Sequence, residues 1–401
     1  MRIKKIIGIG VFFAILAMLL HIMSGAFMAI DSSDIENIEG FYAEPQNSID
    51  MVVMGPSEIY TGYAPAMAWK EYGLKSCHLS IGAVPCNMYK SMVKEILRTQ
   101  QPKLLVVSAA GFSHGDWNLG DEVYLRKWVD SMPFSENKLE TLEEDVPTVA
   151  TDTETGESDS TSESSSVASE DVRKNISDTM YFTLEKYHGN WKDPRAVAAS
   201  FVTRSYMTLS RGGYLKGYYA KADRTGGRDN LANIGQPTEE SYVLTDSCRT
   251  YLEEFLAYCK NAGVQHLLML QPPHETEAAD KSGLDQIKQI TESYGYDFLD
   301  LSTDLESVGI DDANDFCDFE HLNVYGTRKL TSYLGKLAVE KYGIHSETTA
   351  SEKSLWEKSV KKTEEVMDLC ESCIDRGTLM GFGELEATDM YQWYFKNKYL
   401  K

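Results

Sequence analysis

Three side chains in this sequence have the types and the order that acyl transfer through a serine nucleophile requires. Ser57 follows the apolar run 51–54 and a glycine–proline pair, and Asp318 precedes His321 by three positions much later in the chain. Histidine titrates in the range needed to accept the proton of a serine hydroxyl. A carboxylate can hold the imidazole by its other ring nitrogen. If the three side chains meet, the sequence predicts a serine hydrolase or acyltransferase.

Each of these residues also has an ordinary structural interpretation. Serine is a common N-terminal cap of helices, so Ser57 alone favours a capping role. A histidine on a loop is often solvated, and Asp318 is compatible with an ordinary surface acid. The order of the two motifs along the chain shifts the balance toward a triad, because both would lie at the same edge of a parallel sheet.

Short apolar runs alternate with helical patterns in the way that is typical of a parallel α/β sheet. The predicted strands are 49–54, 77–81, 104–108, 265–270 and 296–301. The predicted helices are 64–72, 87–98, 239–262, 278–294 and 323–342. Ser57 follows the first of these strands, and His321 lies on the loop before the last of these helices. The sequence therefore predicts an α/β domain with both motifs beyond the carboxyl ends of its strands.

The N-terminus carries a membrane-spanning pattern. Arg2, Lys4 and Lys5 precede an apolar stretch at residues 6–30, and about 25 residues suffice to cross a bilayer. We favour a retained anchor; cleavage near Ser24, which would give a secreted protein, and a buried soluble helix are the alternatives. Basic residues before the span place the N-terminus in the cytoplasm and the chain after about residue 31 outside.

Charge and composition exclude some classes of partner. The formal net charge of −22 argues against nucleic acid, because phosphates would be repelled. Much of that charge lies in residues 135–171, a segment rich in serine, threonine and acids that contains a single lysine, Lys138. Such a composition predicts a disordered insertion. The chain of 401 residues, 42% of them hydrophobic, is otherwise long enough for one large domain with extensions.

The predicted organisation has five parts: a membrane anchor or uncleaved signal at 1–30, a first part of the α/β domain at 31–134, the insertion at 135–171, a second part at 172–344, and a helical C-terminal extension at 345–401. The aromatic-rich stretch 181–226 is interpreted mainly as core, with the rim of the site as the alternative.

The cysteines and the glycines suggest no cofactor. Seven cysteines are an odd number, so they imply no complete disulfide framework. Cys370 and Cys373 are one helical turn apart, and we interpret them as packing residues or as a pair oxidised outside the cell, rather than as a redox or metal site. No cluster has metal-ligand spacing, and no phosphate-binding glycine motif is present. We therefore expect neither a metal nor a cofactor.

The motifs together resemble the SGNH/GDSL hydrolase superfamily. The matching positions are Gly55-Pro56-Ser57 after the first strand, Gly82 after the second, and Asp318 with His321 before the last helix. The resemblance covers residues 49–344. It is closest to membrane-anchored, extracytoplasmic proteins of bacterial envelopes, such as the D-alanyl transfer type and partners of polysaccharide O-acyltransferases. It implies a three-layer α/β/α sandwich with a flavodoxin-like parallel sheet, a Ser57 nucleophile, a His321 base and an Asp318 orienter.

Other site residues follow from this resemblance and from the strand exits. The backbone N–H groups of Ser57 and Gly82 are expected to bind the oxyanion. The candidate substrate-binding residues, which follow two further strands, are His114, Asp116, Gln271 and His274. The superfamily usually supplies an asparagine from its third block, but the strand exit at 108–111 contains none.

The function that the resemblance implies is that of an extracytoplasmic serine esterase or O-acyltransferase. Its substrate would be the acyl esters of a cell-envelope polysaccharide or teichoic-type polymer. The alternative is a non-catalytic accessory protein that binds glycan or an integral-membrane acyltransferase, and the missing asparagine favours it. Lipase activity on small acyl esters is a third hypothesis.

Overall fold

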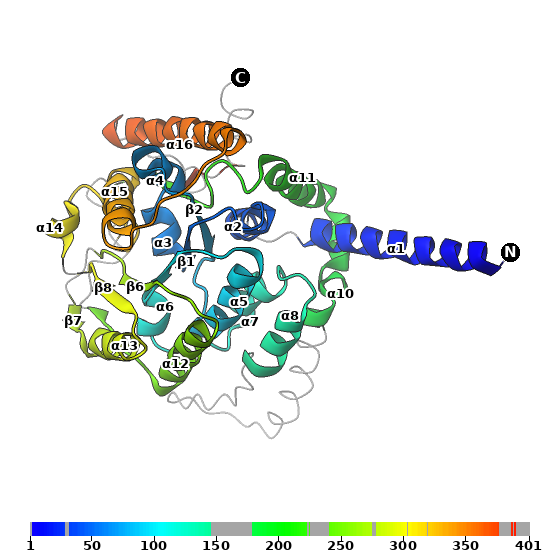
Figure 1. Ribbon diagram of the computed structural model, residues 1–401, viewed down its shortest axis with the longest axis horizontal. Coiled ribbons are helices and arrows are strands. Elements are labelled where there is room, and N and C mark those ends of the chain that lie inside the picture. The colour runs from blue at the N-terminus through cyan, green and yellow to red at the C-terminus, as the bar shows by residue number, and fades with distance from the viewer. Residues whose placement is uncertain are drawn as a thin grey trace, which may run out of the picture.

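A five-stranded parallel sheet forms the centre of the structure, a computed structural model (Figure 1). The described residues are 2–28, 32–145, 179–222, 224, 240–274, 278–302, 304–318, 320–376, 386–387 and 389. The strand order is β2-β1-β3-β6-β8. The bounds are β1 (Met51–Gly55), β2 (Ser76–Ser80), β3 (Leu104–Ser108), β6 (Leu267–Gln271) and β8 (Asp297–Asp300). These strands coincide with the predicted ones apart from small shifts at their ends, so the predicted parallel α/β sheet is confirmed.

Alternate side chains of the strands enter two separate apolar cores, as the twofold period of a strand requires. Val52 and Met54 of β1 belong to one core, and Met51 and Val53 belong to the other. The first core includes residues of α5 (Tyr89–Thr99), α12 (Asp246–Asn261) and α13 (Ser282–Ser293). The second includes residues of α4 (Pro65–Tyr72) and α15 (Val324–Glu340). The sheet is thus buried on both faces, as parallel sheets usually are.

The remaining elements surround this sheet. The shorter helices are α3 (Ser57–Gly62), α6 (Ala110–Ser113), α7 (Glu122–Val129) and α14 (Leu305–Val308). Small strand pairs are formed by β4 (Ala220–Lys221) with β9 (Glu386–Ala387) and by β5 (Glu240–Ser241) with β7 (Ala278–Asp280). Helix α2 (Ser32–Ala43) lies between the edge strand β2 and α11 (Pro194–Ser210) (Figure 1).

The C-terminal extension is a helix that packs on the domain. In α16 (Ala350–Arg376), Trp356 stacks on Trp69 of α4 with ring centroids 6.0 Å apart. Cys370 and Cys373 lie further along α16 in a third apolar core, and both thiols are buried and free. The helix covers residues 350–376 of the predicted helical extension, whereas Glu386–Ala387 form strand β9, and in this structure the two cysteines act as packing residues.

The first part of the acidic segment is ordered, contrary to the prediction of a disordered insertion. Helix α8 (Glu136–Glu140) continues into a π-helical turn, η2 (Thr141–Asp145). Ser135 caps α8 by accepting a hydrogen bond from the Lys138 backbone N–H, and Leu142 is buried in the core with α5. The prediction is wrong for residues 135–145, because the average composition of the segment does not reveal the Ser135 cap or the burial of Leu142. Residues 146–171 of that segment lie outside the described residues.

The N-terminal helix α1 (Arg2–Phe27) projects away from the domain (Figure 1). Within it, the 24 residues Lys4–Phe27 are long and apolar enough to cross a membrane. A length and composition of this kind are consistent with a single N-terminal anchor.

The end of β1 requires a glycine. Gly55 has φ of +149°, and a Cβ built there would lie 2.5 Å from Ser108 Cβ on the neighbouring strand. We expect Gly55→Ala to lower the free energy of unfolding by roughly 2–4 kcal/mol, because backbone strain and overpacking add. Urea denaturation measures this effect. The matched control is Gly73→Ala, with φ of +68° and nothing within 4 Å, which should cost only about 1–2 kcal/mol. Equal losses for the two variants would contradict the close strand contact.

Candidate active site

Ser57, His321 and Asp318 form one chain of hydrogen bonds. The Ser57 hydroxyl donates to His321 Nε2 at 2.7 Å, and His321 Nδ1 donates to Asp318 Oδ1 and Oδ2 at 2.8 and 3.0 Å. This tautomer is the one in which Nε2 is free to take a proton. The arrangement can therefore remove the hydroxyl proton of Ser57 as its oxygen attacks an electrophile.

The local sequence places Ser57 at the exit of β1. Pro56 occupies the cap position of α3, Ser57 is the first helical residue, and the cap makes no side-chain hydrogen bond. Proline is well suited to a helix start because it has no N–H to satisfy and its φ is already fixed. The interpretation of Ser57 as a mere helix cap does not hold, because its hydroxyl faces His321 instead.

The loop that carries Asp318 and His321 is fixed at both of its ends. The backbone N–H of Cys317 donates to the His321 carbonyl at 2.8 Å, and the Asn323 side chain caps α15 by accepting from the N–H of Tyr325. Asp318 Oδ1 also accepts the backbone N–H of His321 at 2.8 Å. The acid is thus held by its own loop and does not depend on the imidazole for its position.

The electrostatics of the pair favour an ionised acid beside a basic imidazole. Burial would raise the pKa of Asp318, but the hydrogen bond and charge of His321 and two backbone N–H groups lower it to about 2. Burial would lower the pKa of His321, but the hydrogen bond and charge of Asp318, with the charge of Glu320, raise it above its usual value. Above that pKa, the neutral imidazole is the form that can act as a base.

Glu320 is expected to tune the pH at which this base works. Glu320 Oε1 lies 3.8 Å from His321 Nδ1. Because its negative charge favours the imidazolium, Glu320→Gln should lower the pKa of His321 and move the ascending limb of a kcat/KM profile to lower pH. The matched control is Glu306→Gln on the outside of α14, which should leave the limb in place. A limb that stays fixed or moves upward in Glu320→Gln would contradict this arrangement.

A second carboxyl group lies buried beside the nucleophile. Glu58 directly follows Ser57 and is only 4% exposed. Burial, together with the charge of Glu320, raises its pKa to about 7, while His274 and His321 oppose that rise. The Glu58 side chain is thus electrostatically linked to both the triad and His274.

The raised pKa of Glu58 predicts a pH-dependent stability. An acid with a folded pKa of about 7 binds more protons in the native state than in the unfolded state, so the wild type should lose stability as pH rises from 5 to 8. Glu58→Gln has no carboxyl group to titrate at this position. Between these pH values its free energy of unfolding should therefore fall by roughly 3 kcal/mol less than that of the wild type. Urea denaturation at both pH values measures the difference. Glu253→Gln, at an exposed position of α12, is the control and should follow the wild type. Equal pH slopes for wild type and Glu58→Gln would refute the burial argument.

The predicted oxyanion donor Gly82 has a partner in this structure. Its backbone N–H donates to Asp34 Oδ1 of α2 at 2.9 Å, and Lys127 Nζ lies 3.0 Å from the other oxygen of Asp34. An oxyanion would have to displace Asp34 before it could use the Gly82 N–H. The backbone N–H of Ser57, at the start of α3, is the other predicted donor.

The four candidate substrate-binding residues do not all lie in one cluster. His114 and His274 lie together, with ring centroids 6.2 Å apart, and Tyr242 lies 6.2 Å from each of them. The charge of His274 also lowers the pKa of Glu58, the residue that follows Ser57. Asp116 instead accepts the Thr245 hydroxyl at 2.5 Å, beside the start of α12.

Gln271 is the strongest of these candidates for contact with a polar ligand. It ends β6, is fully buried, and its side-chain Oε1 and Nε2 have no hydrogen-bond partner among the described residues. A buried, unsatisfied carboxamide costs free energy that a polar ligand or water would recover.

His78, in contrast, is a structural residue. It is buried in β2, where its Nε2 donates to the Tyr63 carbonyl at 2.8 Å. Burial lowers its pKa to about 4, so it stays neutral at physiological pH.

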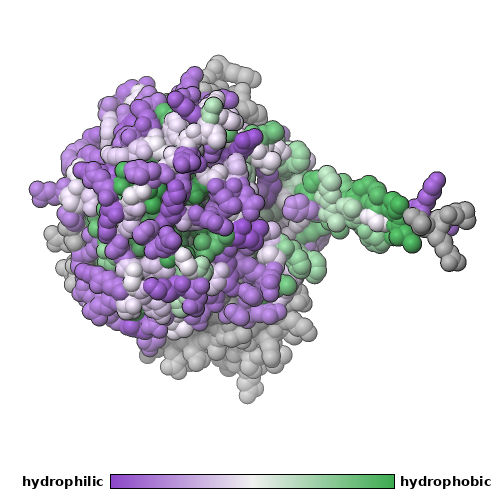
Figure 2. All heavy atoms as spheres, in the orientation of Figure 1, coloured by the Kyte–Doolittle hydropathy of each residue, from purple (hydrophilic) through white to green (hydrophobic). Residues whose placement is uncertain are grey.

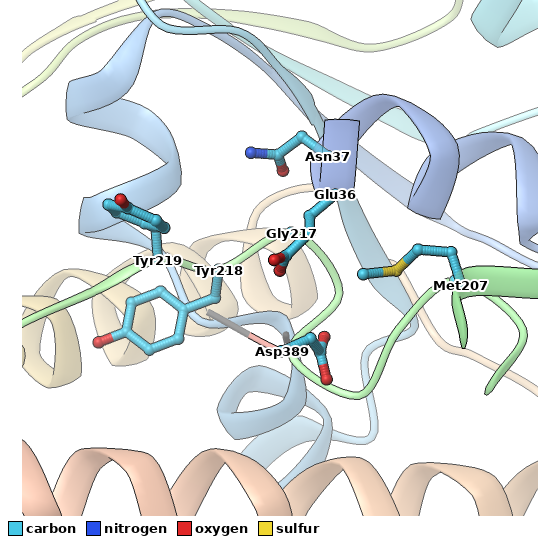
Figure 3. Close-up of a pocket in the computed structure, with 8 residues that line it drawn as sticks. Glu36, Asn37, Met207, Gly217, Tyr218, Tyr219 and Asp389 are labelled. Atoms are coloured by element: carbon cyan, nitrogen blue, oxygen red, sulfur yellow. The ribbon is translucent and has the colours of Figure 1, made fainter. Parts of the chain in front are cut away.

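A small polar cavity adjoins the site without containing the triad (Figure 3). Its lining residues are Glu36, Asn37, Met207, Gly212, Gly217, Tyr218, Tyr219 and Asp389. The Tyr219 ring packs edge-on against the ring of Tyr60, and the two centroids are 5.5 Å apart. Tyr60 lies one helical turn beyond Ser57 in α3. The cavity is therefore a neighbour of the nucleophile helix, and none of the predicted site residues lines it.

Sequence reasoning missed Glu58, Glu320 and Tyr242 as members of this region. The first two were visible as acids directly beside Ser57 and His321, although burial could not be inferred for either of them. Tyr242 lies inside the predicted helix 239–262, but the structure has strand β5 at Glu240–Ser241 and begins α12 only at Asp246. The sequence therefore did not indicate its place beside the two histidines. No residues with the geometry of a metal site occur in the described part of the chain.

The comparisons with known proteins give no match: no family model, no curated protein and no solved structure matches this chain.

Proposed function

We propose that the protein is an SGNH-type serine esterase or O-acyltransferase with a three-layer α/β/α domain. The observation that carries this proposal is the hydrogen-bonded chain from Ser57 through His321 to Asp318. Its place at the carboxyl edge of a parallel sheet supports the proposal, since that edge is where such folds bind ligands.

In the proposed reaction, Ser57 Oγ attacks an ester carbonyl while His321 Nε2 accepts the hydroxyl proton. The tetrahedral intermediate collapses, the acyl group stays on Ser57, and His321 returns the proton to the leaving alcohol. Water or a polymer hydroxyl then attacks the acyl-enzyme, with His321 again accepting the proton. Asp318 stays ionised throughout and stabilises the imidazolium in each step.

The proposed location is the outer face of the cell membrane. The basic residues at the start of α1 favour a cytoplasmic N-terminus, which leaves the domain outside. If the anchor were cleaved, the domain would be secreted. A membrane-held site suggests a substrate that is itself fixed in the envelope, namely the acyl esters of a polysaccharide or teichoic-type polymer. An integral-membrane acyltransferase is a plausible partner in that setting.

The test of the proposal is acyl release from acylated cell-wall polymer and from p-nitrophenyl acetate, with His321→Ala as the inactive control. We expect turnover by the wild type and a loss of turnover in the variant. Activity on the small ester alone would favour a lipase-like enzyme. Equal rates for wild type and His321→Ala on both substrates would overturn the proposal.

A non-catalytic accessory role is the second candidate function. The occupied Gly82 N–H and the absence of an asparagine at 108–111 favour it. On this alternative, the domain would bind glycan or a membrane acyltransferase without reacting. Rescue of a deletion strain by both Ser57→Ala and His321→Ala would favour binding over catalysis, whereas failure of both variants beside a functional wild type would favour the enzyme.

A further inference from the structure

The exposed part of the N-terminal helix matches the thickness of a bilayer. Residues 4–23 are all exposed, whereas residues 24–28 are partly or fully buried against the domain. At about 1.5 Å per residue, the exposed part is roughly 30 Å long, which equals the hydrocarbon core of a typical membrane. A spanning α1 therefore leaves no spare length between the membrane and the domain.

The last turn of α1 is fixed to the domain by direct hydrogen bonds. The Ser24 hydroxyl lies 2.6 Å from the hydroxyl of Thr183, and the Gly25 carbonyl accepts from Ser200 Oγ and Arg204 Nε at 3.0 and 3.1 Å. Asn190 Nδ2 donates to the Phe27 carbonyl at 2.8 Å. All these partners lie within residues 183–204. If α1 spans a membrane, residues 183–204 must therefore lie at the membrane surface that α1 enters.

The same segment carries apolar side chains that the fold leaves exposed. We define the collar as residues 182–209, which contain α10 (Thr183–Tyr187), the 3-10 helix η3 (His188–Lys192) and most of α11. Its exposed apolar residues are Phe182, Trp191, Phe201, Val202 and Leu209. Figure 2 shows the apolar surface of α1 continuing onto the adjoining face of the domain.

A groove joins the collar to the anchor. It is lined almost entirely by apolar side chains from the end of α1 and the start of α11: Ala26, Phe27, Trp191, Pro194, Val197, Ala198 and Phe201. Leu209, two turns beyond Phe201, is 85% exposed, while Ser200, Thr203 and Met207 occupy the opposite, buried face of α11. The exposed face of α11 thus carries apolar side chains that are directed away from the protein.

We propose that the collar lies in the outer interface of the bilayer and that lipid fills the groove beside α1. This inference rests on the proposed membrane anchoring. We assign lipid as the occupant of the groove because the groove is continuous with α1. A domain fixed to the last turn of a spanning helix must touch the lipid around that helix. Tryptophan and phenylalanine are favoured at this depth. Lys192 and Arg195, both exposed beside Trp191, can reach lipid phosphates.

The collar would also fix the active site relative to the membrane. Helix α2 follows the anchor and packs between α11 and the edge strand β2, so the β2 side of the sheet faces the anchor (Figure 1). Strand β1, which positions Ser57, is the next strand inward. The nucleophile would then work at a constant height above the lipid surface, near a polymer attached to the membrane.

Tryptophan quenching in vesicles tests the collar. The full-length protein is reconstituted in phosphatidylcholine vesicles that carry a nitroxide on the lipid headgroup, and flotation first shows whether it is membrane-bound. Trp191 and Trp117 are similarly exposed, at 63% and 58%, but only Trp191 belongs to the collar. We expect the quenchable emission to fall by at least half in Trp191→Phe and to stay unchanged in Trp117→Phe.

The two proposals fail in different ways in this experiment. If the protein floats with the vesicles but is quenched equally in wild type and Trp191→Phe, the collar is overturned and the membrane anchoring by α1 is not. Protein that does not float would overturn the anchoring and the collar together. Equal losses of quenching in Trp191→Phe and Trp117→Phe would also overturn the collar, because a tryptophan outside the collar would then lie as close to the lipid headgroups as Trp191.

Discussion

Ser57→Ala is expected to lower ester turnover by roughly 10⁴-fold or more, because it removes the hydroxyl oxygen that the proposed acyl-enzyme requires. The hydroxyl contributes no helix cap, so the thermal midpoint should stay near that of the wild type. Rates on p-nitrophenyl acetate and the two melting curves measure these effects together.

A second serine at the same sheet edge provides the control for this loss. Ser108 ends β3 and is buried, and its hydroxyl accepts the Ala110 backbone N–H at 3.2 Å. Ser108→Ala should keep most of the activity, although it loses a local hydrogen bond. If Ser57→Ala retains turnover while Ser108→Ala loses it, the assignment of the nucleophile is wrong.

Asp318→Asn is expected to lower kcat by roughly 10⁴-fold, because an amide cannot stabilise the imidazolium or select the required tautomer. The charge and hydrogen bond of Asp318 raise the pKa of His321. Their removal should therefore also move the ascending limb of the residual activity to lower pH. A pH profile of kcat/KM measures both changes.

The control for this prediction is another acid with a local structural role. Asp304 caps α14 by accepting the Ser307 backbone N–H, so Asp304→Asn should affect stability alone. A small loss of rate in Asp318→Asn, with an unshifted profile, would show that the acid does not orient the base.

Much of the sheet and the triad could be predicted from local sequence patterns. The strands are short, and those at 51–55, 76–80 and 267–271 are each followed by a predicted helix. Ser57, Asp318 and His321 were predictable because parallel strands bring their carboxyl ends to one edge. The same logic placed His114 and His274 near the site, and the structure brings their rings together.

Other features depended on contacts that no local pattern reveals. The burial of Glu58 and the bond between Asp34 and Gly82 arise where distant segments meet. The aromatic-rich stretch 181–226 was interpreted mainly as core, and this holds for Tyr218 and Tyr219. It is wrong for Trp191 and its exposed neighbours, because composition does not distinguish an aromatic side chain that packs in the core from one that is exposed.

Labelling with a fluorophosphonate, followed by peptide mass spectrometry, tests the activated nucleophile most directly. We expect a single adduct on Ser57 in the wild type, slow labelling in His321→Ala and none at that position in Ser57→Ala. A wild type that stays unlabelled, or a Ser57→Ala variant that labels as fast as the wild type, would contradict the assignment of Ser57 as the nucleophile.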